Sequence, residues 1–261
     1  SVVLNIIISL IVSSIGLVFL TPILNIFGAT GDNLFYAKEY ISIILAGCVF
    51  QNLGFGINNS IRSEGNPKIA MRTMLVGALL NIILDPIFIF DSIFNIKIGL
   101  GLGIKGAAIA TIISATANTA LVFHYFTSKN SGSVLKIRKR NLKLTFKTCK
   151  DIFSIGLSPF SIQIANSAVV ALYNMGLLKY GGNDAVAAMS IIASISTIIF
   201  MPIFGINQGV QPILGYNYGA KLYSRVIKAI KLAIICGISI ASVGFIAVEL
   251  FPHILFKAFA K

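Results

Sequence analysis

An aspartate and an asparagine lie one helical turn apart inside a long apolar stretch, where ionisable groups are costly and usually serve a function. Asp85 belongs to the run A-L-L-N-I-I-L-D-P-I-F-I-F, and Asn81 precedes it by four residues, so both side chains share a helix face. Pro86 lacks a backbone donor, so we expect a kink here that frees a carbonyl near Ile82. These groups could accept a proton or a small cation such as Na+. The alternative is a structural hydrogen bond to a neighbouring helix.

Two other apolar stretches carry neutral polar side chains at helical spacing. Such stripes commonly join helices to one another. They can equally line a wet cavity, in which amides, hydroxyls and an adaptable methionine would bind amphipathic solutes loosely. The candidate cavity residues are Gln163, Asn166 and Asn174 in the first stretch and Thr197, Met201 and Gln208 in the second.

The remaining motifs argue against an enzyme, because the sequence has no nucleophile elbow, zincin helix or phosphate-binding loop. G-L-G-I-K-G at 101–106 matches the dinucleotide fingerprint only in spelling, since the next acidic residue is Asp151. We expect a flexible loop that enters a helix, and no cofactor. The other loop and helix-end acids are expected to be solvated or near helix starts: Asp32, Glu39, Glu64, Asp91, Asp151 and Asp184.

These residues sit in a chain whose composition is that of a membrane protein. Of its 261 residues, 56% are hydrophobic and 11% are charged, and the mean hydropathy is +0.90. Soluble proteins have about 25% charged residues. Seven stretches are long and apolar enough to span a bilayer. They are Val2–Phe27, Ala37–Ile61, Ile69–Phe90, Ile104–Thr127, Ile152–Leu178, Ala185–Tyr216 and Val226–Phe256.

The net charge of +13 predicts an orientation for these spans. Most of the 21 Lys and Arg residues fall in three alternate connections, above all in the segment 129–150. The positive-inside rule places these connections, and with them Ser1, in the cytoplasm of a multi-pass cell-membrane protein. We interpret 129–150 as a topological anchor that contacts anionic lipid, rather than as a nucleic-acid site.

A weak internal repeat suggests how the spans are grouped. The three residues Leu4, Ser14 and Gly16 recur at one constant offset as Leu232, Ser242 and Gly244. If span seven corresponds to span one, the repeat holds six spans, and the halves are parallel repeats with a binding site between them. This predicts the last four helices of an N-terminal lobe at 1–128, a basic cytoplasmic inter-lobe loop at 129–150, and the first three helices of a C-terminal lobe at 151–261.

Four sequence blocks carry a resemblance to a known family. They are R-S-E-G-N-P-K-I-A-M (62–71), N-I-I-L-D-P-I-F-I-F (81–90), G-I-K-G-A-A-I-A-T (103–111) and G-V-Q-P-I-L-G-Y-N-Y-G-A (209–220). In this order and spacing the chain resembles the multidrug and toxic compound extrusion (MATE) family, in its DinF-like branch. The resemblance implies a fragment that covers about helices 3–9 of 12. The expected fold is an all-α membrane protein, a polytopic helical bundle within a two-lobed 6+6 transporter with parallel repeats.

The resemblance also implies roles for particular residues. Asn81 and Asp85 match an asparagine and an aspartate of that branch's N-lobe cation site, and Thr111 resembles a threonine of the same network. The branch's other key aspartate belongs to the first helix, which this chain lacks. No mid-membrane acid in 152–178 matches those of another branch's seventh helix. That disfavours sodium coupling through the C-lobe and leaves H+ and Na+ both open.

We therefore expect a monomeric antiporter that exports organic, often cationic, compounds in exchange for H+ or Na+ by alternating access. Its partners would be small organic solutes and the lipid bilayer, with no nucleic acid. The first alternative is a lipid-linked oligosaccharide flippase, although such a carrier would be expected to have basic residues mid-membrane, and none is present. The second is a channel or a non-transporting subunit. A channel should show a pore loop or a ring of charges.

Overall fold

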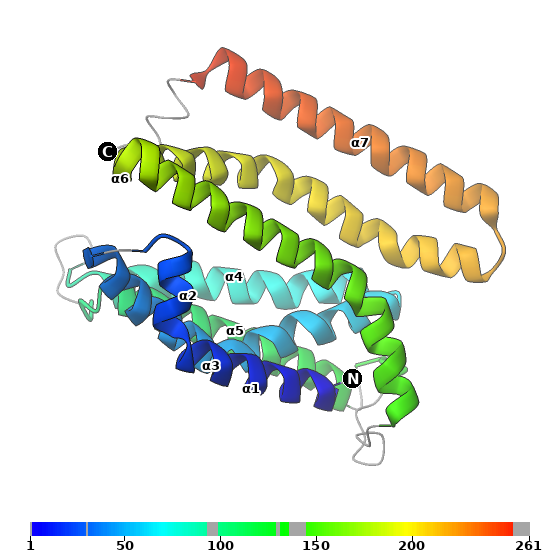
Figure 1. Ribbon diagram of the computed structural model, residues 1–261. Coiled ribbons are helices and arrows are strands. Elements are labelled where there is room, and N and C mark those ends of the chain that lie inside the picture. The colour runs from blue at the N-terminus through cyan, green and yellow to red at the C-terminus, as the bar shows by residue number, and fades with distance from the viewer. Residues whose placement is uncertain (1, 30, 93–98, 129–130, 136–144, 253–261) are drawn as a thin grey trace. The chain divides into compact units, whose positions relative to one another are not determined.

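The computed structural model describes residues 2–29, 31–92, 99–128, 131–135 and 145–252, and in these ranges every regular element is a helix (Figure 1). Two compact units, Ser1–Met175 and Gly176–Lys261, are described separately below. The helices are α1 (Val2–Val18), α2 (Leu20–Ile26), α3 (Gly31–Ser63), α4 (Pro67–Ile89), α5 (Ile104–Thr127), α6 (Phe146–Gly219) and α7 (Tyr223–Leu250).

The number of spans agrees with the prediction. Six helices within the described ranges are long and apolar enough to cross a membrane, and there are seven if the bent pair α1 and α2 counts as one span. The long α6 supplies two of them, Phe146–Gly182 and Asp184–Gly219, which meet where Gly182 leaves helical geometry at φ 66°. That φ is readily adopted only by glycine.

The first span differs from the single helix expected over Val2–Phe27. The angle between α1 and α2 is 78°. Figure 1 shows the two helices running in different directions. Pro22 has no N–H to donate to the carbonyl of Val18. The helix breaks at that carbonyl, and regular bonding resumes when the Ile23 amide donates to Phe19.

The predicted loop 129–150 ends earlier than expected, because α6 begins at Phe146 and takes in Lys147 and Lys150. Several parts of the sequence predictions lie outside the described residues: Ser1, Lys129, the basic residues from Lys136 to Lys143, and the end of the seventh span as far as Phe256. The side chain of Asp32 lies outside the description as well.

In the first unit, α1 and α3 are joined by a ladder of polar side chains. Asn52 donates to the Ser9 hydroxyl at 3.1 Å, and the Ser9 hydroxyl donates to the Asn5 amide oxygen at 3.2 Å. Farther along, the Ser13 hydroxyl donates to the carbonyl of Leu45 at 2.6 Å. Hydrogen bonds of this kind hold helices together where lipid removes the hydrophobic driving force.

Small residues allow α5 to approach both of its neighbours closely. Ala108 and Ala110 are completely buried. A Cβ atom on Gly106 would collide with the backbone carbonyl of Phe88 in α4, and one on Gly47 of α3 would collide with Ile112. The three helices α3, α4 and α5 therefore pack side by side (Figure 1).

The glycine-rich segment before α5 folds back along the end of α4 and is hydrogen-bonded to it, whereas the sequence predicted a flexible loop. Its amides from Leu100 to Gly103 donate to carbonyls in the last turn of α4 and just after it, from Ile87 to Phe90. Gly101 and Gly103 have φ of +61° and +55°. A Cβ atom on Gly101 would collide with Asp91. The glycines thus permit close backbone approach and satisfy the end of α4.

The most deeply buried polar side chain, Asn58, lies where α3 turns into α4. It is fully buried and donates to the carbonyl of Ala70 at 3.0 Å and to the hydroxyl of Thr73 at 2.8 Å. Its own amide oxygen accepts from Arg62 at 3.1 Å. Around it the core of this end is apolar and includes Leu53, Ile57, Ile61, Val122 and Phe126.

We expect Asn58→Ala to lower the stability of the protein by about 1–3 kcal/mol, because it removes the buried hydrogen bonds that join α3 to Ala70 and Thr73 of α4. The measurement is thermal unfolding of the full-length protein in detergent. Asn59→Ala is the control, since the neighbouring amide takes no part in these hydrogen bonds. An equal loss for both variants would contradict a special role of Asn58.

In the second unit, α7 packs against the later part of α6. A Cβ atom on Gly244 would meet the side chain of Ile199 at 2.5 Å, and one on Gly237 would meet Ile203 at 3.7 Å. These two pairs run in opposite directions along the helices, so α6 and α7 are antiparallel here.

Candidate ion site and cavity residues

The two residues of the predicted ion site, Asn81 and Asp85, are hydrogen-bonded to each other within α4. The Asn81 side-chain amide donates to Asp85 Oδ1 at 2.9 Å, and both side chains are half-buried. The bond orients the carboxylate and leaves its second oxygen for another ligand. The helix continues for one turn beyond Asp85 to Ile89 even though it contains Pro86. As Pro86 has no N–H, the carbonyl of Ile82 has no donor at its usual helical position.

Thr111 lies at the level of Asn81 along the contact between α4 and α5. The register follows from Gly77, which faces the Ser114 carbonyl and Asn118. The two helices are antiparallel, so one step forward along α4 corresponds to one step back along α5. One turn forward from Gly77 is Asn81, and one turn back from Ser114 is Thr111. The Thr111 hydroxyl donates to the carbonyl of Ala107 at 2.9 Å, so its proton is used inside α5 while its oxygen can still accept or ligate.

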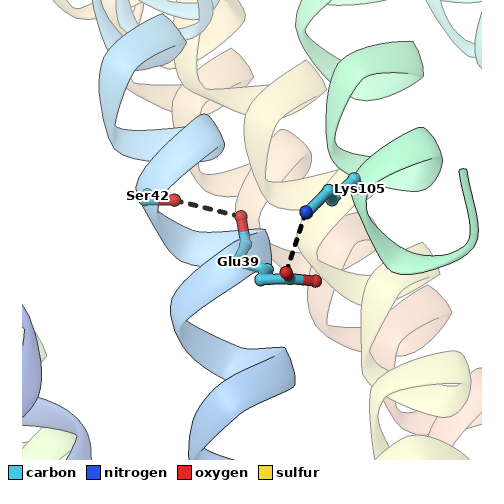
Figure 2. Close-up of polar contacts among 3 residues, drawn as sticks. All are labelled: Glu39, Ser42 and Lys105. Carbon is cyan, nitrogen blue, oxygen red and sulfur yellow. Dashed lines mark hydrogen bonds and ion pairs between the residues drawn. The ribbon is translucent and has the colours of Figure 1, made fainter.

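An ion pair joins α3 and α5 near the same end of the bundle. Lys105 Nζ lies 2.9 Å from Glu39 Oε1, and Figure 2 shows that the two side chains meet between the helices. Because Gly106 packs on Phe88, this pair lies about one helical turn, ~5 Å, beyond Asp85 along the bundle. Glu39 was expected to be solvated or near a helix start, whereas the structure places it inside α3 and pairs it with Lys105.

Three of the predicted cavity residues belong to the first unit, in α6. Gln163 and Asn166 are exposed within the described chain. Asn174 is half-buried, and its side chain donates to the carbonyl of Phe27 at the end of α2, at 3.4 Å. For Asn174 the structure therefore shows a helix-joining contact, which was the alternative to a cavity role.

The other three lie in the second unit, on the later part of α6. Thr197 and Met201 are exposed, and Gln208 is half-buried. The Thr197 hydroxyl donates to the carbonyl of Ala193 at 2.8 Å, one turn earlier on its own helix. The stripe Thr197–Met201–Gln208 thus presents one hydroxyl oxygen, one thioether and one amide at helical spacing.

Sequence reasoning missed the contacts of Glu64, which was expected to be solvated or near a helix start. The structure places this half-buried carboxylate against the hydroxyl of Tyr125 at 3.0 Å and the backbone amide of Leu135 at 2.6 Å. The partners are 61 and 71 residues away in the sequence, so no local pattern could have indicated them.

Within the described residues, no group of three His, Cys, Asp or Glu side chains could hold a metal ion. Neutral oxygens lie on the same helix as Asp85 and on the neighbouring α5. Asp85 Oδ2, the Ile82 carbonyl and the Thr111 hydroxyl are oxygens of the kind that Na+ accepts, and a proton needs only the carboxylate.

Comparisons with known proteins agree on one family. The family model MatE matches residues 1–87 and 159–261. "Multidrug export protein MepA" of Staphylococcus aureus (strain bovine RF122 / ET3-1) is 33% identical over 252 residues, which cover 93% of this chain and 53% of the relative. The protein of the same name from Staphylococcus haemolyticus (strain JCSC1435) is 30% identical over 256 residues, which cover 98% and 54%. The chain thus spans about half the length of these curated relatives.

Solved structures give the same result. The MATE multidrug transporter DinF-BH, solved in complex with a ligand, superposes with a TM-score of 0.82 at 36% identity, over 98% of this chain and 56% of that one. An outward-facing MATE family transporter of the MOP superfamily superposes at 0.77 with 27% identity, over 100% and 56%. The inward-facing conformation gives 0.74 at 27% identity, over 99% and 57%.

Proposed function

The chain belongs to the MatE family, whose members are multi-pass membrane transporters and not enzymes, and on that premise we propose that the full-length protein is a secondary active antiporter. It exports organic, often cationic, compounds in exchange for H+ or Na+. The observation that carries this proposal is the Asn81–Asp85 pair, a half-buried carboxylate held by an amide inside a membrane-spanning helix. An acid in that position is costly unless it binds something.

Coupling would follow because the ion and the drug each bind preferentially to a different conformation of the protein. Asp85 takes up the ion from outside, which disfavours drug binding, and the inward-facing conformation releases the ion and takes up drug. Each ligand biases the same movement of two lobes, so each lowers the affinity for the other by the same factor. In this proposal the segment 129–150 and the Ser1 end face the cytoplasm, in keeping with the positive-inside rule.

The cavity residues would select solutes by shape and charge rather than by a fixed hydrogen-bond pattern. Gln163, Asn166, Thr197, Met201 and Gln208 offer neutral polar atoms and one polarizable sulfur on α6. A methionine adapts to different shapes, which suits a site that accepts several compounds. Asn174 contributes less in this proposal, because its amide already donates to Phe27.

We expect Met201→Ala to change the KM of individual dyes by about tenfold or less, with a different size for each dye, because it removes apolar contact without touching the ion site. Efflux should keep the ion dependence of the wild type. The control is Met71→Ala, an exposed methionine near the start of α4 and outside the cavity set. A uniform loss for all dyes would instead indicate that Met201 supports the fold.

The experiment that tests the function is efflux of a cationic dye by the full-length protein in membrane vesicles. A pH gradient and a sodium gradient are imposed separately, and an ionophore that collapses each gradient serves as the control. Efflux driven by one gradient supports the proposal and identifies the ion. If neither gradient moves any cationic dye, the antiporter proposal fails, and a lipid-linked oligosaccharide flippase or a non-transporting subunit would replace it.

A further inference from the structure

Among the described residues of the first unit, one buried side-chain oxygen accepts no hydrogen bond. It is Oδ1 of Asn118, in the second half of α5. The large majority of buried polar side-chain atoms in native proteins are paired. An unpaired buried acceptor costs free energy, because it has given up its hydrogen bonds with water. This oxygen therefore marks a place where a hydrogen-bond donor would be bound favourably.

The Asn118 side chain lies between two glycines of the neighbouring helices. A Cβ atom on Gly54 of α3 would lie 3.0 Å from the Asn118 amide nitrogen, and one on Gly77 of α4 would lie 3.1 Å from the Asn118 Cβ. The amide thus fits where neither neighbour has a side chain. All three helices belong to the first unit and contact one another. The unpaired oxygen is therefore part of the contact between α3, α4 and α5.

The polar side chains on either side of this level are already paired. One turn from Gly77 in one direction is Asn81, whose amide donates to Asp85 at 2.9 Å. One turn in the other direction is Thr73, whose hydroxyl also takes part in hydrogen bonds. Thr73, Gly77, Asn81 and Asp85 follow one another at four-residue intervals along α4. Asn118 supplies the polar group at the level of Gly77, and its oxygen is the unpaired member of this row.

An amide oxygen only accepts hydrogen bonds or ligates a cation, so its ligand must be a donor or an ion. In the closed contact Oδ1 is shielded from water, and a donor reaches it only when the helices separate slightly. The glycines at 54 and 77 ease this movement, because they have no side chain that interlocks with Asn118. A water molecule that enters gains a hydrogen bond that the closed contact lacks.

We propose that Asn118 is a hydration site: water enters between α3, α4 and α5 and donates to Oδ1, and the coupling ion passes this water when it leaves Asp85. The site lies one turn of α4, about 5 Å, from the level of Asn81. Polar groups inside a membrane bundle commonly mark ion pathways. The hydration depends only on the contacts above, whereas the passage of the ion rests on the proposed antiporter function.

Thermal unfolding of the full-length protein in detergent distinguishes an unpaired amide from a paired one. Asn118→Leu keeps the branching at Cγ and removes the unpaired oxygen, so the melting temperature should stay the same or rise. Asn58→Leu is the matched control, since Asn58 is a buried amide that donates to Thr73 at 2.8 Å. The control should melt at a lower temperature. An equal fall for both variants would overturn the assignment of Asn118 as unpaired.

Cysteine labelling of the full-length protein tests the hydration. Ser114 is buried one turn before Asn118 on α5, so Ser114→Cys in a cysteine-free background places one thiol beside the site. A small water-soluble methanethiosulfonate should modify this thiol, and adding Asn118→Leu should slow the reaction by about tenfold. Thr116→Val should not slow it, because the Thr116 hydroxyl donates within its own helix at 2.8 Å. An unreactive thiol, or equal rates with and without Asn118→Leu, would overturn the hydration site.

Dye efflux tests the passage of the ion. Asn118→Leu should lower kcat by about tenfold and leave the Kd of the dye unchanged, because ion release is slowed and the cavity residues are untouched. Asn118→Thr keeps an acceptor oxygen and should restore most of the rate. A normal kcat in Asn118→Leu would overturn the passage of the ion and leave the hydration site standing. Labelling needs neither dye nor gradient, so a wild type without efflux removes the antiporter and the ion passage but not the hydration result.

Discussion

Asp85→Asn is expected to abolish gradient-driven efflux by the full-length protein while dye binding is retained. Asparagine has nearly the shape of aspartate and can still accept the hydrogen bond from Asn81. It carries no charge and takes up no proton near neutral pH, so the link between ion and drug is lost. Coupling free energies typically correspond to 5–150-fold effects, so efflux should fall by more than about tenfold.

The measurement compares dye efflux and dye binding for the two proteins under the gradient that drives the wild type. Asp91→Asn is the matched control, because Asp91 is exposed beyond the end of α4 and does not contact Asn81. Normal efflux by Asp85→Asn would make the residue structural, and the coupling assignment would be wrong. Loss of both efflux and binding would indicate misfolding, which the elution profile of the purified variant would reveal.

What could be predicted from the sequence depends on local patterns. The spans follow from hydropathy over about 20 residues, and the helices agree with the predicted boundaries to within several residues. The Asn81–Asp85 hydrogen bond could be expected as well, since four residues in a helix place two side chains on one face. Both features involve a single helix, so no knowledge of the packing is required.

Contacts between distant segments could not be predicted in this way. Glu64 and Ser133 are 69 residues apart, and nothing in R-S-E-G-N-P indicates that its acid binds a segment beyond α5. Asn58 belongs to an N-N-S sequence that resembles a glycosylation site, yet its amide is the buried centre of the α3–α4 contact. Polar residues of this kind are recognised only when the packing that buries them is known.

Proline and glycine were identified correctly as special positions, but their effects were only partly predictable. Val2–Phe27 was expected to be one span, and the structure adds a 78° bend at the carbonyl that Pro22 cannot bond. The glycines at 99–103 were interpreted as flexible, whereas the returning backbone is hydrogen-bonded to the end of α4. A glycine in a sequence can indicate either a flexible backbone or a close approach between two backbone segments. Which of the two applies depends on the segment that lies next to it in the structure.

Gly106→Leu is expected to disrupt the contact between α4 and α5 and to give the largest loss of stability of the changes considered. A Cβ atom at this position collides with the carbonyl group of Phe88, which is backbone and has no rotamer through which to escape. The helices must then move apart or shift along each other. Overpacking costs typically about 1–3 kcal/mol and occasionally more, and a backbone obstacle belongs at the upper end.

Thermal unfolding in detergent measures this effect, with Ala120→Leu as the control. Ala120 lies on the same helix and is exposed, so leucine there meets no buried neighbour within the described residues. An unchanged melting temperature for Gly106→Leu would contradict the close approach of α4 and α5. This contact also sets Thr111 at the level of Asn81. Any Gly106→Leu protein that still folds should therefore lose ion-driven efflux as well.

The atoms that an added Cβ would meet also predict which of two smaller substitutions, Gly106→Ala or Gly77→Ala, lowers the melting temperature more. At Gly77 an added Cβ would meet the Asn118 Cβ at 3.1 Å and the Ser114 carbonyl oxygen at 3.5 Å, so a shift of a few tenths of an ångström between the two helices accommodates it. At Gly106 the nearest atoms are the backbone carbonyl of Phe88, whose displacement moves the whole last turn of α4. Gly106→Ala should therefore lower the melting temperature more than Gly77→Ala. The reverse order would mean that the α4–α5 contact is tightest at Asn118, and the register that sets Thr111 at the level of Asn81 would have to be revised.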